Sequence, residues 1–250
     1  MKVTAEGFFP ETVPLRWVKF VIAVFLLPVM WVLTKAFLNV FAGAAWQGVA
    51  SLSMETISFF GGLLLWWFIF LTLPRPTWLY VFGHELTHAL WVVLSRGRVH
   101  EFRVSREGGH VVTNKTGTLI ALAPYFFPIY SILFIAVYGY VTWLWKDFAA
   151  WRMAPMVLYA GVGITWSFHF TFTCWMIPKG QADLEYGGYF FSLAIIYIIN
   201  LLCLATMLLV VLPGATFMEF GRSLFENGIV LVSLLSECAR KIFLLVRWES

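Results

Sequence analysis

Residues 77–94 read TWLYVFGHELTHALWVVL, and this stretch decides what kind of fold the chain can form. It has the length and apolar character of a helix that crosses a membrane. Its only acidic or basic side chains are His84, Glu85 and His88, which together form an HExxH motif. Placing such groups in hydrocarbon is costly unless they are paired or bind a metal. The stretch therefore predicts a metal site inside a membrane helix.

The composition of the whole chain is that of a membrane protein. Of its 250 residues 61% are hydrophobic and 12% charged, and the mean hydropathy is +0.83. Soluble domains are roughly 45–50% apolar and about 25% charged. The net charge of +4 is small and spread over the loops, so a nucleic-acid partner is not indicated. We expect an integral, multi-pass membrane protein in contact with the lipid bilayer.

The apolar stretches predict an all-α polytopic fold with about six transmembrane helices, since about 20 apolar residues span a bilayer. The predicted spans are 17–38, 57–73, 77–94, 117–145, 154–177 and 188–211. Residues 98–114 alternate between polar and apolar side chains around Gly108-Gly109, which predicts a small β-hairpin at the membrane surface. The tail after Pro213 has the pattern of an amphipathic helix lying on the membrane.

This pattern divides the chain into three regions. Residues 1–76 form an N-terminal region with two spans, and residues 77–191 form a core with the HExxH helix, the hairpin and two further helices. Residues 192–250 hold the last span and the amphipathic tail.

The HExxH spacing fits zinc chemistry. Residues four apart lie on one face of a helix, so His84 and His88 can present two imidazoles to one ion. A catalytic zinc site takes three protein ligands and leaves the fourth position to water, whose pKa falls from about 15.7 towards 7. Glu85 is placed to accept a proton from that water and to pass it to a leaving amine.

A third ligand is needed, and the chain has only two aspartates. In a six-span topology the ends of the third and fifth spans face the same side of the membrane. Asp183, which follows the fifth span, can then reach the histidines, whereas Asp147 lies on the opposite side. Glu185 is the alternative third ligand. His169 is expected to be a packed or hydrogen-bonded histidine, and the hairpin residues His100 and His110 are expected to be interfacial.

The order of these features resembles the site-2-type intramembrane metalloproteases. In that family a membrane-embedded HExxH helix is followed by a membrane-associated β-hairpin, a helix with a Gly-Pro motif, and a helix ending in a proline-containing stretch with a ligand aspartate. Here the hairpin at 98–114 follows the HExxH motif, Ala123-Pro124 stands where the family has Gly-Pro, and Pro178 and Asp183 follow. The resemblance covers roughly residues 77–191.

The resemblance implies a zinc endopeptidase that hydrolyses a peptide bond in or near a transmembrane segment of a membrane protein or peptide. The active site of such an enzyme lies towards the cytosolic face. A locally unwound substrate would add as a strand to the hairpin edge. The resemblance thus makes five residues candidate substrate-binding positions: Val104, Gly108, Gly109, Val111 and Pro124.

Two other functions are compatible with an HExxH motif in a membrane helix. A metal transporter would carry further His or Asp residues along a path through neighbouring helices, and this chain offers only His169 there. A proteolytically silent binding protein of the same fold would have no need of a base such as Glu85, which is intact.

Overall fold

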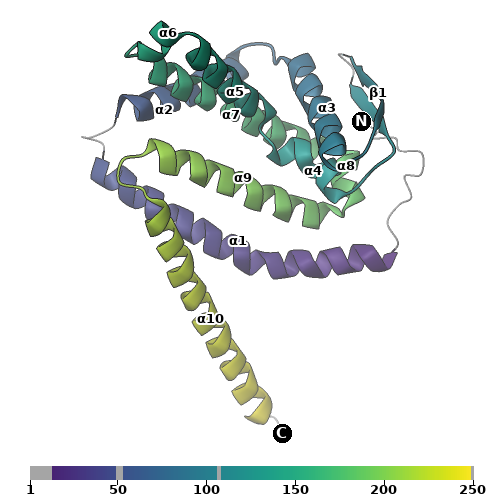
Figure 1. Ribbon diagram of the computed structural model, residues 1–250. Helices are drawn as coiled ribbons and strands as arrows, with labels where there is room; N and C mark the ends of the chain where they lie inside the picture. The colour runs from purple at the N-terminus through teal and green to yellow at the C-terminus, as the bar shows by residue number, and fades with distance from the viewer. Residues whose placement is uncertain (1–12, 49–52, 106–107, 249–250) are drawn as a thin grey trace. The chain divides into compact units, whose positions relative to one another are not determined.

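The computed structural model describes residues 13–48, 53–105 and 108–248, and these residues are mainly helical (Figure 1). They form two compact units, residues 13–22 with 53–196 and residues 23–48 with 197–248. Helices α1 (Val13–Gly48) and α9 (Tyr189–Val211) contribute to both units. Every other described element belongs to a single unit.

The first unit holds most of the helices and the only sheet in the described residues. Its remaining elements are α2 (Met54–Thr72), α3 (Thr77–Leu94), β1 (Val99–Val104), β2 (Gly109–Thr113), α4 (Thr118–Phe126), α5 (Ile129–Leu144), α6 (Lys146–Ala150), α7 (Ala154–Met176), the 3₁₀ turn η2 (Ile177–Lys179) and α8 (Ala182–Tyr186).

Small residues bring α2 and α7 into close contact. A Cβ atom added to Gly62 would lie 2.1 Å from the Ala160 carbonyl oxygen, and one added to Gly163 would lie 2.2 Å from that of Phe59. Further along, the Trp66 indole N–H donates to Thr171 Oγ1 at 2.9 Å. Such backbone-to-backbone packing is typical of helices in membranes, where small residues replace the hydrophobic effect as the basis of association.

An aromatic cluster then fixes the start of α3 against this helix pair. Trp66 of α2, Tyr80 of α3, and Phe168 and Phe172 of α7 are buried together. The rings of Tyr80 and Phe172 stack with centroids 4.9 Å apart. The first turns of α3 are therefore held near the end of α7, which places the HExxH motif beside the chain that follows α7.

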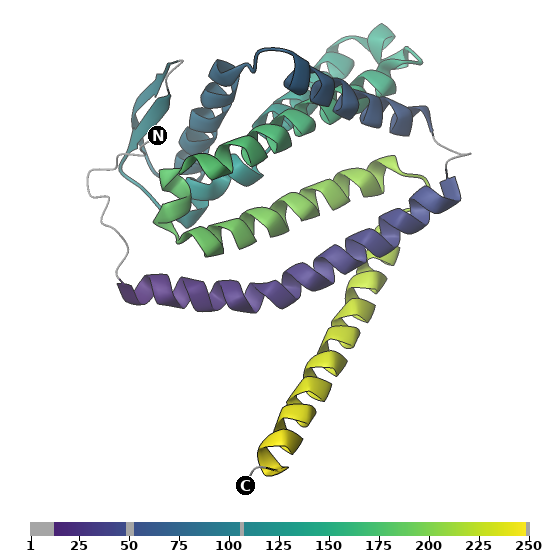
Figure 2. The same ribbon diagram turned by 180° about the vertical axis from the view of Figure 1, so that it is seen from behind.

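The predicted β-hairpin is confirmed. Strands β1 and β2 pair antiparallel, with Phe102 opposite Val111 and Val104 opposite Gly109. The hairpin lies beside α3 in both views of the chain (Figures 1 and 2). Fully buried Val111 anchors β2, whereas Phe102 on β1 is exposed.

The second unit contains most of α1, the rest of α9 and the long helix α10 (Phe217–Trp248). Thr216 and Glu219 form a capping box at the start of α10, since each backbone N–H donates to the other side chain at 3.1 Å. The apolar side chains of Phe225, Val232 and Phe243 are exposed along α10. A helix is therefore present where the amphipathic tail was expected, and its position on a membrane surface stays a prediction.

Six transmembrane helices are not supported. Among the described residues three helices are long and apolar enough to cross a membrane, at Leu15–Ala44, Met54–Thr72 and Tyr189–Val211. A fourth span results only if α4 and α5, which are bent by 68° at a short break, count as one. The bend falls at Pro128, whose missing N–H interrupts the helix.

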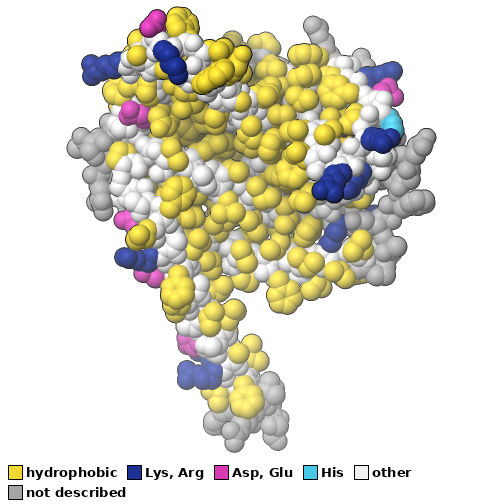
Figure 3. Space-filling model, in the orientation of Figure 1, with side chains coloured by type: hydrophobic (Ala, Val, Ile, Leu, Met, Phe, Trp, Pro, Cys, Tyr) yellow, Lys and Arg dark blue, Asp and Glu magenta, His cyan; other side chains and the backbone are white. Residues whose placement is uncertain are grey.

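The other two predicted spans, α3 and α7, are not among these helices, because both carry polar side chains that lower their hydropathy. Buried His84, Glu85 and His88 lie on α3, and buried Ser167 and Thr171 lie on α7. The surface of the first unit in Figure 3 is mainly hydrophobic, with charged side chains gathered near α6 and near the hairpin. Membrane association is thus supported.

Candidate metal centre

Three potential metal ligands meet between α3 and α8. His84 and His88 lie one turn apart on α3, with their Nε2 atoms 3.1 Å from each other. Asp183 of α8 places Oδ2 3.4 Å from His84 Nε2 and 3.6 Å from His88 Nε2. All three side chains are buried, and they form the only group of this kind in the part of the chain that the structure describes.

These distances fit a tetrahedral ion. Zinc bonds of 2.0–2.2 Å place neighbouring tetrahedral ligand atoms about 3.3 Å apart. The three observed separations, 3.1, 3.4 and 3.6 Å, lie around that value. Two imidazole nitrogens and a carboxylate oxygen that face one another so closely need a positive charge among them. The residues present therefore fit a bound cation.

Each of the three potential ligands has a further hydrogen-bond partner that orients it. His88 Nδ1 lies 2.9 Å from the Ile120 carbonyl oxygen, and His84 Nδ1 lies 3.0 Å from the Tyr80 hydroxyl. The Tyr125 hydroxyl donates to Asp183 Oδ2 at 3.1 Å. Outer partners of this kind fix the ring orientation of ligand histidines and are usual in protein metal sites.

The chain after α7 folds back to deliver Asp183. Gly180 has φ = 70°, a left-handed conformation that glycine adopts without strain, and it turns the chain after η2. Fully buried Leu184 then anchors α8, and the Ser192 hydroxyl donates to the Leu184 carbonyl oxygen at 2.9 Å. Asp183 is thereby held inside the unit.

The two other acidic candidates lie elsewhere. Glu185, on the same short helix, is exposed, and Asp147 is exposed on α6. Burial alone would raise the pKa of the Asp183 carboxyl, but the adjacent His84 and His88 rings outweigh burial and hold that pKa below its ordinary value. The two histidines thus favour the ionised form of the Asp183 carboxyl.

Glu85 lies beside this group with no hydrogen-bond partner. Its side chain is fully buried, and neither carboxylate oxygen has a hydrogen bond within the described residues. Burying an unpaired carboxylate is costly, so its presence here calls for a physical explanation. Gly109 of β2 packs closely against the Glu85 side chain, since a Cβ atom added to Gly109 would lie 2.6 Å from Glu85 Cγ.

The other predicted substrate-binding residues lie on two sides of the centre. Val104 pairs with Gly109 at the turn end of the hairpin, and Gly108 leads into β2 with φ = 149°. The Val111 side chain is fully buried, so it packs inside the unit. Pro124 is buried in α4 and lines a small pocket next to His84.

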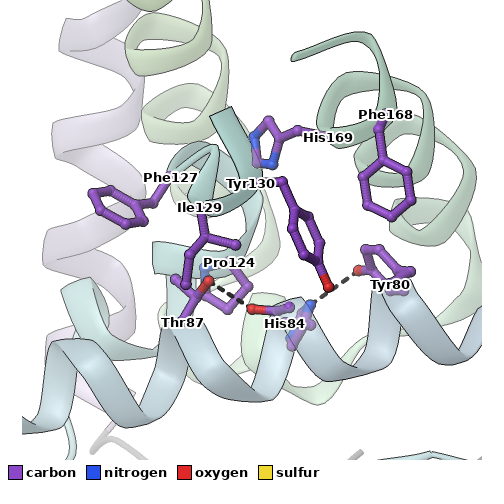
Figure 4. A pocket seen from close by; sticks show the side chains of 10 residues that line it. Tyr80, His84, Thr87, Pro124, Phe127, Ile129, Tyr130, Phe168 and His169 are labelled. Atoms are coloured by element: carbon purple, nitrogen blue, oxygen red, sulfur yellow. Dashed lines mark hydrogen bonds between the residues drawn. The ribbon is translucent and has the colours of Figure 1, made fainter. Parts of the chain in front are cut away.

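This pocket lies between α3, the break from α4 to α5, and α7 (Figure 4). The pocket is small, with a cavity volume of about 20 Å³, so it holds one or two waters or a group of similar size. Tyr80, Gly83 and His84 form one wall, and the half-buried Phe127 and Tyr130 also line the pocket.

The remaining histidines are not in the ligand group. His169 is buried and lines the pocket, consistent with the packed histidine expected at that position. His110 lies 3.5 Å from Glu101 across the hairpin, and His100 is exposed.

Sequence reasoning missed the groups that orient the ligands. Tyr80 stands four residues before His84 on α3, and that spacing could have suggested a contact. Tyr125 and the Ile120 carbonyl come from α4, and no local spacing relates them to α3 or α8. Comparison with known proteins adds no further guide, since no family model, curated protein or solved structure matches the chain.

Proposed function

We propose that this chain is a zinc-dependent endopeptidase that hydrolyses a peptide bond in or near a membrane-spanning segment of another protein. The observation that carries the proposal is the pairing of two features. One is a buried ligand group at tetrahedral separations, and the other is a buried glutamate, one residue away in the chain, that has no hydrogen-bond partner among the described residues. A ligand group alone is compatible with many kinds of metalloprotein. Glu85 beside it supplies a general base, which a hydrolytic enzyme needs.

The residues have distinct roles in this proposal. His84, His88 and Asp183 would hold the ion, and a bound zinc ion would supply Lewis-acid chemistry and acidify water. The Glu85 carboxylate takes a proton from the attacking water and later gives it to the leaving amide nitrogen. Burial of all four side chains excludes bulk water from the reacting groups.

The substrate backbone would pass between the hairpin and the pocket. Gly109 lies against Glu85 on one flank of the HExxH motif, and the pocket lined by Gly83 and Thr87 lies on the other. An extended peptide crossing the site would then place one side chain towards the pocket, whose size favours a small one. A peptide bond in an intact helix is shielded and already hydrogen-bonded, so the substrate would have to unwind locally.

Two other functions receive less support. A transporter needs ligands along a path, and the described residues hold one potential ligand group. A silent binding protein has no use for a buried glutamate such as Glu85, which finds no hydrogen-bond partner in the part of the chain that the structure describes. Both alternatives predict no peptide cleavage that depends on Glu85.

The test uses the full chain in detergent and a labelled leucine-rich transmembrane peptide with a central Gly-Ala-Ser segment. Glu85→Gln should retain wild-type metal content and lose cleavage by a factor of at least about 10². His84→Ala should lose both metal and cleavage. Wild-type turnover in Glu85→Gln would refute the proposed mechanism.

A further inference from the structure

Pro124 lies inside α4, and its backbone has no N–H group. In an α-helix the N–H of each residue donates to the carbonyl four residues earlier, which for Pro124 is the carbonyl of Ile120. Helical hydrogen bonds are made at both ends of α4, from the Ala121 N–H to the Gly117 oxygen at 2.9 Å and from the Phe127 N–H to the Ala123 oxygen at 2.8 Å. Ile120 is therefore the interior carbonyl of α4 that lacks its helical donor.

That carbonyl instead meets the metal centre. The Ile120 oxygen lies 2.9 Å from His88 Nδ1, and a carbonyl oxygen can only accept a hydrogen bond. His88 must therefore carry its proton on Nδ1, which leaves the Nε2 lone pair directed at His84 and Asp183. This is the tautomer that a ligand histidine needs.

We propose that Pro124 is a positioning residue for the metal centre: because it has no N–H, no helical donor at this position competes with His88 for the Ile120 carbonyl, which holds His88 in its ligand tautomer. The proposal rests on the metal site of the proposed function. In it Pro124 acts on the metal centre, which differs from the role of a residue that contacts the substrate. A substrate contact changes the affinity for peptide, whereas this role changes the affinity for metal.

The experiment compares three chains with the wild type. Pro124→Ala adds an N–H at this position, and replacing Pro124 by lactate gives the same methyl side chain on an ester that has no N–H. Pro28→Ala, at the proline inside α1, controls for the general effect of removing a proline from a helix. Zinc affinity is measured by competition with a chelator. The His88 tautomer is read by ¹⁵N NMR of the metal-free chain labelled at histidine, with His88→Gln to assign the signal.

Pro124→Ala should bind zinc roughly 10–100-fold more weakly than the wild type, the usual effect of losing an outer hydrogen bond to a ligand. The lactate chain and Pro28→Ala should bind as the wild type does. The share of His88 protonated on Nδ1 should fall in Pro124→Ala alone. Because alanine suits a helix interior better than proline, Pro124→Ala should fold.

Three results would overturn the proposal. They are wild-type zinc affinity in Pro124→Ala, equal weakening in the alanine and lactate chains, and an unchanged His88 tautomer. A wild-type chain that binds no zinc would refute the proposed function instead. In that case the tautomer in the metal-free chain still decides whether Pro124 directs the Ile120 carbonyl to His88.

Discussion

Gly109, the first residue of β2, lies directly against the side chain of Glu85. A Cβ atom at Gly109 would lie 2.6 Å from Glu85 Cγ and 2.8 Å from the Arg103 carbonyl oxygen. Since the paired strand cannot yield easily, any larger residue at this position has to displace the glutamate. The hairpin therefore sets the position of the base in the proposed mechanism.

Gly109→Ala should consequently lower peptide cleavage strongly, by about 10² or more, while metal content stays at the wild-type level, because Glu85 moves and the ligands do not. Gly139→Ala on α5 is the matched control, since a Cβ there meets nothing within 4 Å. Cleavage rate and metal content are measured on the same preparations. Full activity in Gly109→Ala would show that the position of Glu85 does not depend on the hairpin.

Gly62→Ala should destabilise the contact between α2 and α7. The added methyl group would collide with the Ala160 carbonyl, and overpacking of this kind costs about 1–3 kcal/mol. Its neighbour provides the control, because a Cβ at Gly61 meets nothing within 4 Å. The midpoint of thermal unfolding in detergent should fall for Gly62→Ala and stay level or rise for Gly61→Ala. Equal midpoints would argue against the close packing of these helices.

Tyr125→Phe should weaken metal binding without unfolding the chain. The change removes the hydroxyl that donates to Asp183 Oδ2 and keeps the buried ring, and such outer contacts contribute roughly 10–100-fold to metal affinity. Tyr140→Phe, at an exposed position on α5, serves as the control. Zinc affinity is measured by chelator competition. An unchanged affinity would mean that the Asp183 carboxylate needs no help from Tyr125.

Ile129→Ala should widen the pocket beside His84. Ile129 is buried in the pocket wall at the start of α5, and its truncation adds room for a larger substrate side chain. Relative cleavage of transmembrane peptides that carry Ala or Leu at the central position should shift towards Leu by roughly 10-fold. Ile132→Ala on the exposed face of α5 should leave the ratio unchanged. The same ratio in both variants would place the substrate side chain elsewhere.

The sequence was informative where the chemistry is local. The HExxH spacing predicted that His84 and His88 share a helix face, and the alternation around Gly108-Gly109 predicted the hairpin. The number of spans could not be predicted in this way. Counting apolar stretches overestimated the spans, because polar side chains lower the hydropathy of α3 and α7 and a 68° bend separates α4 from α5.

For Asp183 the prediction of the ligand agrees with the structure, but the span count on which it was based does not. The sequence named it as third ligand by counting six spans, and that count is not supported. The structure nevertheless brings Asp183 to the histidines, because the stacking of Tyr80 on Phe172 holds the start of α3 near the end of α7, and Gly180 turns the chain back. The contacts from α4, by contrast, depend on tertiary packing that no spacing in the sequence encodes.

The most direct test of the account is the zinc content of the purified chain, measured by mass spectrometry for the wild type, Asp183→Ala and Glu185→Ala. The wild type and Glu185→Ala should each hold about one zinc ion per chain, and Asp183→Ala should hold less than about a tenth of that, since two histidines alone make a weak site. Undiminished zinc in Asp183→Ala, or no zinc in the wild type, would contradict the assignment of His84, His88 and Asp183 as the metal centre.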